Sequence, residues 1–257
     1  MHKATISIPS QLPSSTIAVE NGGRSGARWK ALIFDVDGTL YHQAPVRRAM
    51  LRRLLRAYLT DPLQGFSTLR ALRSYRHAQE ELRHGPLAPG DVVAMQVQLA
   101  AQRVGLNADT MQALVTRWIE QEPLPFLASA TRKGTVELLQ AARKKGLRLA
   151  SCSDYPAEGK LAAMGIADYF DVMVSAQHPK VQRFKPDPRS LELTIQELAI
   201  QKEEAIYIGD RSDVDAVAAS RAGIQSIILS PGQDWTQVSE MLTQRGREVA
   251  VSSGGER

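Results

Sequence analysis

Apolar residues follow two different patterns along this chain. Short apolar runs, each of a length typical of a buried strand, lie at 31–36, 147–152, 172–174, 205–208 and 226–229. Between the later runs, apolar residues recur at helical spacing, so that strands alternate with helices. Gly146 and Gly223 stand where helices should end before strands. This alternation predicts an α/β fold with a parallel sheet.

The segment 46–121 differs, because its pattern is helical throughout and contains no predicted strand. Asn107 is a candidate helix N-cap within it. Its apolar positions recur three and four residues apart, as in Met50, Leu51, Leu54, Leu55 and Tyr58. The first strand therefore belongs to a sheet whose other strands all follow a helical insert.

These patterns divide the chain into a core and an insert. We expect a three-layer, Rossmann-like core domain at 30–44 and 125–245, and a small all-helical domain at 45–124. The Ser-, Gly- and Pro-containing residues 1–29 are expected to form a disordered extension. Residues 246–257 are expected to form a flexible tail.

Composition changes this picture mainly by indicating where in the cell the protein is expected. The chain has 257 residues, of which 43% are hydrophobic, and it contains no run of eighteen apolar residues. No membrane partner is therefore expected. The N-terminal residues lack the apolar segment of a secretory signal. Cys152 is the single cysteine and cannot form an internal disulfide, which favours a reducing compartment and a cytoplasmic location.

Positive charge is concentrated in the insert. Nine Arg and no Lys lie between Pro45 and His84, against Asp61, Glu80 and Glu81. We interpret this charge as a solvated helix face, with a phosphate-steering or nucleic-acid surface as the alternatives. No nucleic-acid motif accompanies it, so no nucleic-acid partner is expected.

Two carboxylates lie at the end of the first apolar run, Asp35 as its one charged residue and Asp37 directly after it. A carboxylate can attack phosphorus to form an acyl-phosphate, and two negative reactants need a cation between them. The second carboxylate can protonate the leaving oxygen and then take a proton from water. A plain Asp-Gly turn is one alternative. An EF-hand calcium loop is excluded, because Leu40 and Val46 stand where Gly and Glu are required.

A second polar segment, Ser151 to Asp154, begins at the end of the run at 147–152. A hydroxyl here can hold a phosphate oxygen, although a turn or N-cap serine is the ordinary interpretation. A cysteine-phosphatase loop would need Arg six residues after Cys152, where the sequence has Glu158. Cys152 is therefore interpreted as a small buried hydrophobe. The residues themselves leave the choice between Ser151 and Ser153 open.

Two lysines, Lys180 and Lys185, lie after the run at 172–174 and can neutralise a phosphate, although loop lysines are ordinarily solvated. Two prolines near Lys185 make its loop the more rigid one.

The fourth polar segment contains Asp210, Asp213 and Asp215 and directly follows the run at 205–208. Mg²⁺ prefers oxygen ligands in octahedral geometry. We therefore predict that Asp35, the backbone carbonyl of Asp37 and Asp210 bind Mg²⁺, with Asp215 behind these ligands. For Asp213, a helix N-cap is the favoured interpretation.

These four segments, in this order and each after a predicted strand, resemble the four motifs of the haloacid dehalogenase superfamily of phosphohydrolases. The resemblance covers residues 29–229 and favours Ser153 over Ser151 and Lys185 over Lys180. It implies that Ser153, Asp154 and Lys185 bind phosphate. The positions that match the motifs are Asp35, Asp37, Ser153, Lys185, Asp210 and Asp215.

The insert between the first two motifs is similar to the helical cap of one subclass, which suits small substrates. Asp37 argues against carbon–halogen and phosphonate cleavage, because family members with those activities lack this carboxylate. The resemblance implies a Mg²⁺-dependent hydrolase that removes phosphate from a small phosphorylated metabolite through an aspartyl-phosphate on Asp35. Candidates for substrate recognition or surface are Arg47, Arg48, Tyr75, Arg76, Arg83, His84 and Trp118.

Three alternatives remain open. A phosphomutase of the sugar-phosphate type would use the same core. A receiver-like signalling domain also forms an aspartyl-phosphate, but it needs neither Asp37 nor a cap. A non-catalytic protein could keep the fold alone.

Overall fold

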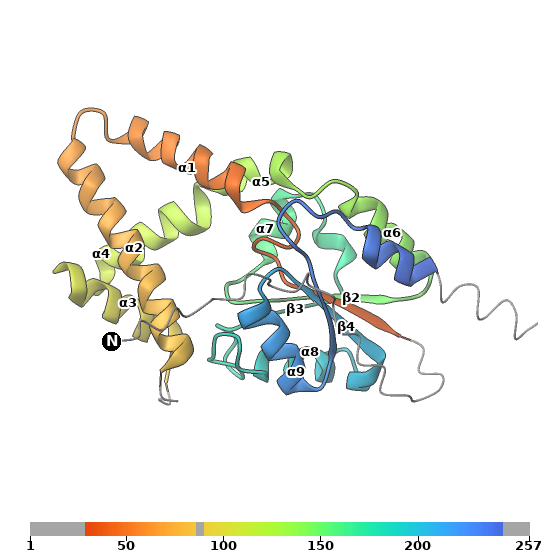
Figure 1. Ribbon diagram of the computed structural model, residues 1–257. Coiled ribbons are helices and arrows are strands. Elements are labelled where there is room, and N and C mark those ends of the chain that lie inside the picture. Colours follow the sequence, from red (N-terminus) through yellow and green to blue (C-terminus); the bar gives the residue numbers. More distant parts are fainter. Residues whose placement is uncertain (1–28, 86–89, 244–257) are drawn as a thin grey trace, which may run out of the picture.

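The structure, a computed structural model, describes residues 29–85 and 90–243 (Figure 1). Residues 1–28 and 244–257, which carry the expected extension and tail, lie outside the described residues. None of the described helices is both long and apolar enough to cross a bilayer.

A five-stranded parallel sheet forms the centre of the core. Its strands are β1 (Ala31–Phe34), β2 (Arg148–Ser153), β3 (Val172–Ser175), β4 (Ala205–Gly209) and β5 (Gln225–Ile228), in the order β3-β2-β1-β4-β5. The first strand in the sequence is thus the central strand, paired on both sides and buried along its whole length. The predicted parallel sheet is confirmed.

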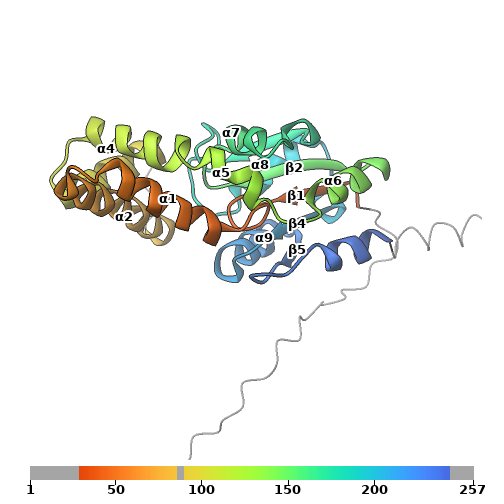
Figure 2. The ribbon, with the colours of Figure 1, turned by 90° about the horizontal axis from the view of Figure 1, so that it is seen from above.

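Helices cover both faces of the sheet, which makes the core a three-layer α/β structure (Figure 2). Alternate residues of β1 point to opposite faces. Leu32 and Phe34 pack in one apolar cluster with Leu139, while Ala31 and Ile33 pack in another with Leu191. The covering helices are α6 (Thr135–Lys144) and α7 (Glu158–Ala163) on the first face, and α8 (Arg189–Glu197) and α9 (Val217–Ala222) on the second.

The predicted helical insert is confirmed, and no strand occurs among its described residues. It contains α1 (Gln43–Ala57), α2 (Pro62–His84), α3 (Val92–Val104), α4 (Ala108–Val115) and a π-helical turn η1 (Thr116–Gln121). After it, α5 (Leu124–Ala130) leads back towards the core. The remaining short helical turns are η2 (Ala167–Tyr169), η3 (Lys202–Glu204) and η4 (Ser212–Ala216).

Helices α2, α3 and α4 form the apolar centre of the insert. Tyr75 of α2, Ala100 of α3 and Met111 of α4 are buried together. Asn107 caps α4 as predicted, because its side chain accepts a hydrogen bond from the backbone N–H of Thr110 at 2.7 Å. Such a cap contributes about 1 kcal/mol.

Helix α1 departs from the expected burial pattern. Of the apolar positions that recur along it, Leu54 is buried, but Leu51 and Leu55 are 51% and 58% exposed. The ribbon shows the reason, since α1 and α2 diverge from the loop that joins them and leave part of each helix uncovered (Figure 1). The three- and four-residue spacing of these apolar positions predicted the helix correctly, but only some of the positions are buried.

Candidate active site

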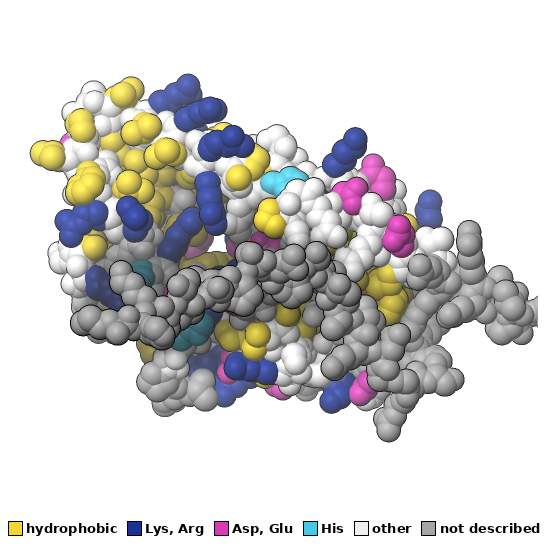
Figure 3. All heavy atoms as spheres, in the orientation of Figure 1, with side chains coloured by type: hydrophobic (Ala, Val, Ile, Leu, Met, Phe, Trp, Pro, Cys, Tyr) yellow, Lys and Arg dark blue, Asp and Glu magenta, His cyan; other side chains and the backbone are white. Residues whose placement is uncertain are grey.

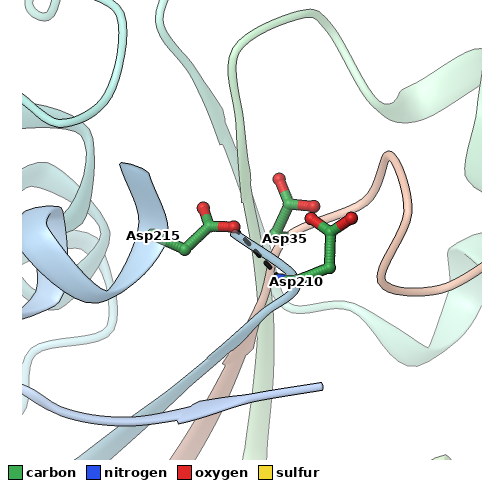
Figure 4. Close-up of side chains that lie close together, drawn as sticks. All are labelled: Asp35, Asp210 and Asp215. Carbon is green, nitrogen blue, oxygen red and sulfur yellow. Dashed lines mark hydrogen bonds between the residues drawn. The ribbon is translucent and has the colours of Figure 1, made fainter. Parts of the chain in front are cut away.

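The carboxyl ends of β1 and β4 bring three aspartates together. Asp35 follows β1, Asp210 follows β4, and Asp215 lies in η4 (Figure 4). One carboxylate oxygen from each lies within 4.8 Å of the others. Asp215, which the sequence analysis placed behind the metal ligands, thus contributes an oxygen to the same cluster as Asp35 and Asp210.

The loop after Asp35 approaches Asp210 so closely that it requires glycine. Gly38 has φ +102°, and a Cβ atom at this position would lie 2.0 Å from Oδ2 of Asp210. No other residue fits this backbone conformation and this contact without moving the carboxylate. Gly38 therefore allows the first and fourth motifs to meet.

Lys185 binds two of the three aspartates. Its Nζ lies 2.7 Å from Oδ1 of Asp35, 2.7 Å from Oδ1 of Asp215 and 2.8 Å from the hydroxyl of Tyr207. Burial lowers the pKa of Lys185, but the two carboxylates outweigh that effect and hold the pKa well above its usual value. Lys185 is therefore a fixed cation at the site, whereas Lys180 is exposed.

The aspartate cluster suits a cation. Burial raises the pKa of Asp35 to about 8, with Lys185 opposing this effect and Asp215 adding to it. Burial, and then the charge of Asp215, raises the pKa of Asp210 to about 6. Carboxylates held this close repel one another, and a bound divalent cation would relieve the repulsion. The residues present therefore fit a Mg²⁺ site.

Asp37 lies in a different environment from Asp35. Lys160 of α7 donates to both carboxylate oxygens of Asp37 at 2.6 Å, and the hydroxyl of Tyr41 donates to one of them. Burial raises the pKa of Asp37, but the Lys160 ammonium and these hydrogen bonds outweigh burial and hold the pKa below its usual value. The backbone carbonyl of Asp37, a predicted metal ligand, accepts from Nε2 of Gln43 at 2.7 Å.

The sequence analysis missed Lys160. The only signal available was a lysine in the helix after the second motif, and the sequence does not reveal that this helix points it at Asp37.

The serines of the second motif occupy different positions. Ser153 ends β2, is buried, and donates to the backbone carbonyl of Tyr155. Ser151 lies inside the sheet opposite Phe34, and its hydroxyl has no hydrogen-bond partner among the described residues. Ser153 is thus the serine at the strand end, and its role in phosphate binding stays a prediction.

Asp154 connects the core to the insert. Its carboxylate accepts from the backbone N–H of Lys185 at 3.0 Å, from Nε2 of Gln79 at 3.0 Å and from Nη2 of Arg83 at 2.8 Å. Arg83 also donates to the backbone carbonyl of Lys185, and its side chain is only 3% exposed.

A further ion pair joins Glu80 to Arg211 at 3.1 Å. Gln79, Glu80 and Arg83 of α2 therefore contact the second, third and fourth motifs together, and we call these three residues the latch. Arg83, one of the candidates for substrate recognition, is used for this contact.

Arg132 holds the loop of the first motif from behind. It is 3% exposed and donates to the backbone carbonyls of Thr39 at 2.8 Å and Gly38 at 2.9 Å, and also to that of Gln233. It was not predicted, because a single arginine in a loop gives no sequence signal for such a role.

Two smaller expectations have different outcomes. Cys152 is fully buried, and burial raises the pKa of its thiol to about 11, as expected of an inert hydrophobe. The N-cap prediction for Asp213 was wrong. Its carboxylate instead pairs with Arg211 at 2.7 Å, and η4 has no side-chain cap.

A cavity of about 530 Å³ lies between the core and the insert and includes the aspartate cluster. Its polar end contains Asp35, Asp37 and Lys160. Its other walls come from the insert, where Arg47, Arg73 and Arg76 line it, whereas Arg48 does not. Apolar side chains on the same walls include Met50, Leu51, Leu54, Leu69 and Leu72.

Comparisons with known proteins agree with this geometry. The sequence model of the haloacid dehalogenase-like hydrolases matches residues 29–223. The chain is 27% identical to a phosphoglycolate phosphatase of Rhodospirillum rubrum, covering 82% of this chain and 84% of that protein. It is 29% identical to a fructose-1-phosphate phosphatase of Escherichia coli, covering 78% and 96%.

A similar solved structure is that of a putative hydrolase of the same family from Bacillus subtilis, bound to magnesium. The TM-score is 0.60 with 17% identity, and the match covers 84% of this chain and 99% of that one. Because the two sequences are only 17% identical, this structural similarity is evidence for the fold alone.

Proposed function

The chain belongs to the haloacid dehalogenase-like hydrolase family, and from this premise we propose that it is a Mg²⁺-dependent phosphatase acting on phosphate monoesters. Its helical insert between β1 and β2 corresponds to the helical-cap subclass of that family. The observation that carries the proposal is the pair Asp35 and Asp37 at the end of the central strand. Lys185 binds the first carboxylate and Lys160 the second.

Asp35 is the proposed nucleophile. Its carboxylate attacks phosphorus while the ester P–O bond breaks, which leaves an aspartyl-phosphate and an alcohol. Thr39 donates to Oδ2 of Asp35 at 3.0 Å and Lys185 binds Oδ1, so that the carboxylate has a fixed orientation. Mg²⁺, when bound by Asp35, Asp210 and the backbone carbonyl of Asp37, would neutralise the repulsion between the nucleophile and the substrate dianion.

Asp37 is the proposed acid and base. Because Lys160 and Tyr41 hold Asp37 ionised at rest, the proton for the leaving oxygen passes from these donors by way of Asp37. Asp37 then takes a proton from the water that hydrolyses the aspartyl-phosphate and returns it to them, which releases inorganic phosphate and restores Asp35. Lys160 and Tyr41 both donate to Asp37, so two proton-carrying groups border the carboxylate that exchanges protons. Ser153, Asp154 and Lys185 are the proposed phosphate-binding group, with Asp154 acting through the backbone N–H of Lys185.

Small phosphorylated metabolites are the proposed substrate class, and the cytoplasm is the proposed location. The relatives named above act on phosphoglycolate and fructose 1-phosphate. The cavity holds the catalytic carboxylates at one end and cap arginines along its wall, an arrangement that suits a phosphorylated anion.

The test is a panel of phosphorylated metabolites incubated with purified protein and Mg²⁺, with inorganic phosphate as the readout. We expect phosphate release that stops with a chelator and is inhibited by Ca²⁺, which prefers more ligands at longer distances than Mg²⁺ does. Isomerised sugar phosphate without net phosphate release would instead assign a phosphomutase. Full activity in the chelator would contradict the proposed metal dependence.

A further inference from the structure

The exposed apolar side chains of this protein are concentrated on one helical hairpin. Among the described residues, the large hydrophobic side chains that are exposed number six, and five of them lie on α1, α2 or the loop between these helices. The sixth is Val136 on α6, at 37% exposure. The five, which we call the leucine face, are Leu51 (51%), Leu55 (58%), Leu59 (73%), Leu63 (81%) and Phe66 (63%).

Their clustering is visible on the surface. Hydrophobic side chains gather over the end of the insert where α1 and α2 meet, with Lys and Arg side chains along the margins (Figure 3). The ribbon shows that this end projects away from the core (Figure 1). Isolated exposed leucines are ordinary, whereas a group of five on one projecting hairpin indicates a partner.

The charge beside the leucine face is positive, and in the part of the chain that the structure describes it is compensated only at Arg53, which pairs with Glu122. Helix α1 contains five arginines and no acidic residue. Within the described parts of the chain, Arg48, Arg52 and Arg56 make no ion pair. Asp61, the acidic residue at the tip, caps α2 by accepting from the backbone N–H of Gln64 at 2.9 Å. The partner of this surface should therefore be both apolar and anionic.

A second copy of this chain does not meet that requirement. Contact across a two-fold axis would place the leucine face against itself and bring the same arginines together, which like-charge repulsion opposes. A bilayer with anionic lipids offers acyl chains to the leucines and negative headgroups to the arginines. Basic helices with leucine and phenylalanine on one side bind such surfaces.

We propose that the leucine face, with Arg48, Arg52 and Arg56, docks on the surface of a bilayer that carries anionic lipids. Leu51 belongs both to this face and to the wall of the catalytic cavity, so docking would bring the mouth of the cavity beside the lipid. The sequence analysis interpreted these arginines as a solvated face and expected no membrane partner. Helical spacing did not reveal that the leucines between these arginines are exposed. This exposure is the reason for replacing a solvated face with a membrane-docking surface.

The test is flotation of the full chain with vesicles of equimolar phosphatidylcholine and phosphatidylglycerol, compared with vesicles of phosphatidylcholine alone. We expect binding to the anionic vesicles and at least tenfold weaker binding to the neutral ones, since each arginine at an anionic surface contributes about fivefold. High salt should weaken the binding. Equal binding to both vesicles, or binding to neither, would overturn the proposal.

Variants locate the surface. Leu59→Asp with Leu63→Asp should reduce vesicle binding at least tenfold, whereas Val136→Asp, a matched change on α6, should leave it as in the parent protein. Arg52→Gln with Arg56→Gln should reduce binding more than Lys144→Gln with Lys145→Gln, which removes the same charge from the core. If each double variant and its control reduce vesicle binding equally, docking at the leucine face is refuted. Circular dichroism confirms that each variant is folded.

Two other occupants give distinct results. A lipid-free dimer in sedimentation analysis that Leu59→Asp with Leu63→Asp dissociates would assign the face to a second copy. Binding to polyglutamate but not to anionic vesicles would assign it to an acidic protein. Both results contradict lipid docking. Because the measurement involves no turnover, its result is separate from that of the phosphatase proposal.

Discussion

The proposed active site at the end of the sheet and the α1–α2 hairpin both contain several charged residues, but the cations of the site have partners within the described structure, whereas several of those on the hairpin do not. At the sheet, Lys185, Lys160 and Arg132 each contact named carboxylates or carbonyls, and Lys185 is almost fully buried. On the hairpin, Arg48 and Arg52 are exposed and have no ion-pair partner among the described residues.

This difference separates two kinds of function. Charges that are already bound within the protein position other groups, and their removal should affect chemistry. Charges without an internal partner remain available to something outside the protein, and their removal should affect encounter or docking while the chemistry continues. The following predictions test that division, beginning with the catalytic end of the sheet.

The largest effect is expected for Asp35→Asn. An amide keeps the shape of the carboxylate but cannot attack phosphorus, so phosphate release should fall by on the order of 10⁴-fold or more. Burial raises the pKa of Asp35 to about 8, so the metal-free folded protein keeps this carboxyl protonated between pH 4 and 8 while the unfolded chain ionises it. The resulting cost in stability increases as pH rises through that range. Calorimetry of the metal-free variant at pH 8 should therefore show a melting temperature no lower than that of the parent. Near-normal turnover would contradict the proposed nucleophile.

Lys160→Met should reduce kcat by on the order of 100-fold, the lower end of general acid–base effects. The methionine keeps the length of the side chain but removes both contacts to Asp37. Lys144→Met, at an exposed position of α6, is the matched control. If the two variants have the same steady-state kinetics, Lys160 does not position the proposed acid and base.

Arg83→Met should reduce kcat/KM by about tenfold, the effect of losing a charge-assisted contact. It removes the contacts from the latch to Asp154 and to the backbone carbonyl of Lys185, and so weakens the contact between α2 and two motifs. Arg70→Met, on an exposed position of the same helix, should change kcat/KM little. If Arg83→Met and Arg70→Met reduce kcat/KM equally, the loss reflects only the positive charge of α2, and the contacts of the latch have no separate role.

The smallest effect concerns salt. If the cavity arginines attract the substrate, kcat/KM should fall severalfold as ionic strength rises past about 0.1 M, where screening acts within roughly 10 Å, while kcat changes little. Replacing Arg73 and Arg76 by Ser should weaken this dependence more than replacing Lys144 and Lys145 at the C-terminal end of α6. Arg47 also lines the cavity and can be tested in the same way, whereas Arg48 does not line it. An unchanged salt dependence of kcat/KM in the Arg73 and Arg76 variant would show that these arginines do not attract the substrate.

Much of the fold could be predicted because the core signals are local. Runs such as 205–208 are apolar and short, and Asp210 follows this one after a single glycine. Both the sheet and the position of this carboxylate could therefore be expected from neighbours in the sequence. The residues that were missed act over long separations. Lys160 binds Asp37, and Arg132 binds the loop at Gly38, through backbone positions that only the assembled fold brings together.

Burial was also hard to predict where a helix lacks a neighbour. Leu51 and Leu55 have the spacing of a buried stripe, yet α1 diverges from α2 and leaves them exposed. Periodicity shows which residues share one side of a helix. Whether that side is covered depends on how the helices are arranged, which periodicity does not report.

The central position of β1 also determines when the protein can fold during synthesis. Ala31 pairs with Arg148 on one side and with Ala205 on the other. At synthesis rates of roughly 5–20 residues per second, β1 leaves the ribosome on the order of ten seconds or more before its second partner strand exists. The helices of the insert, whose contacts are local, can fold during this interval. The nascent chain would thus carry a formed leucine-rich hairpin and an unpaired apolar strand before β4 joins the sheet that holds the proposed site.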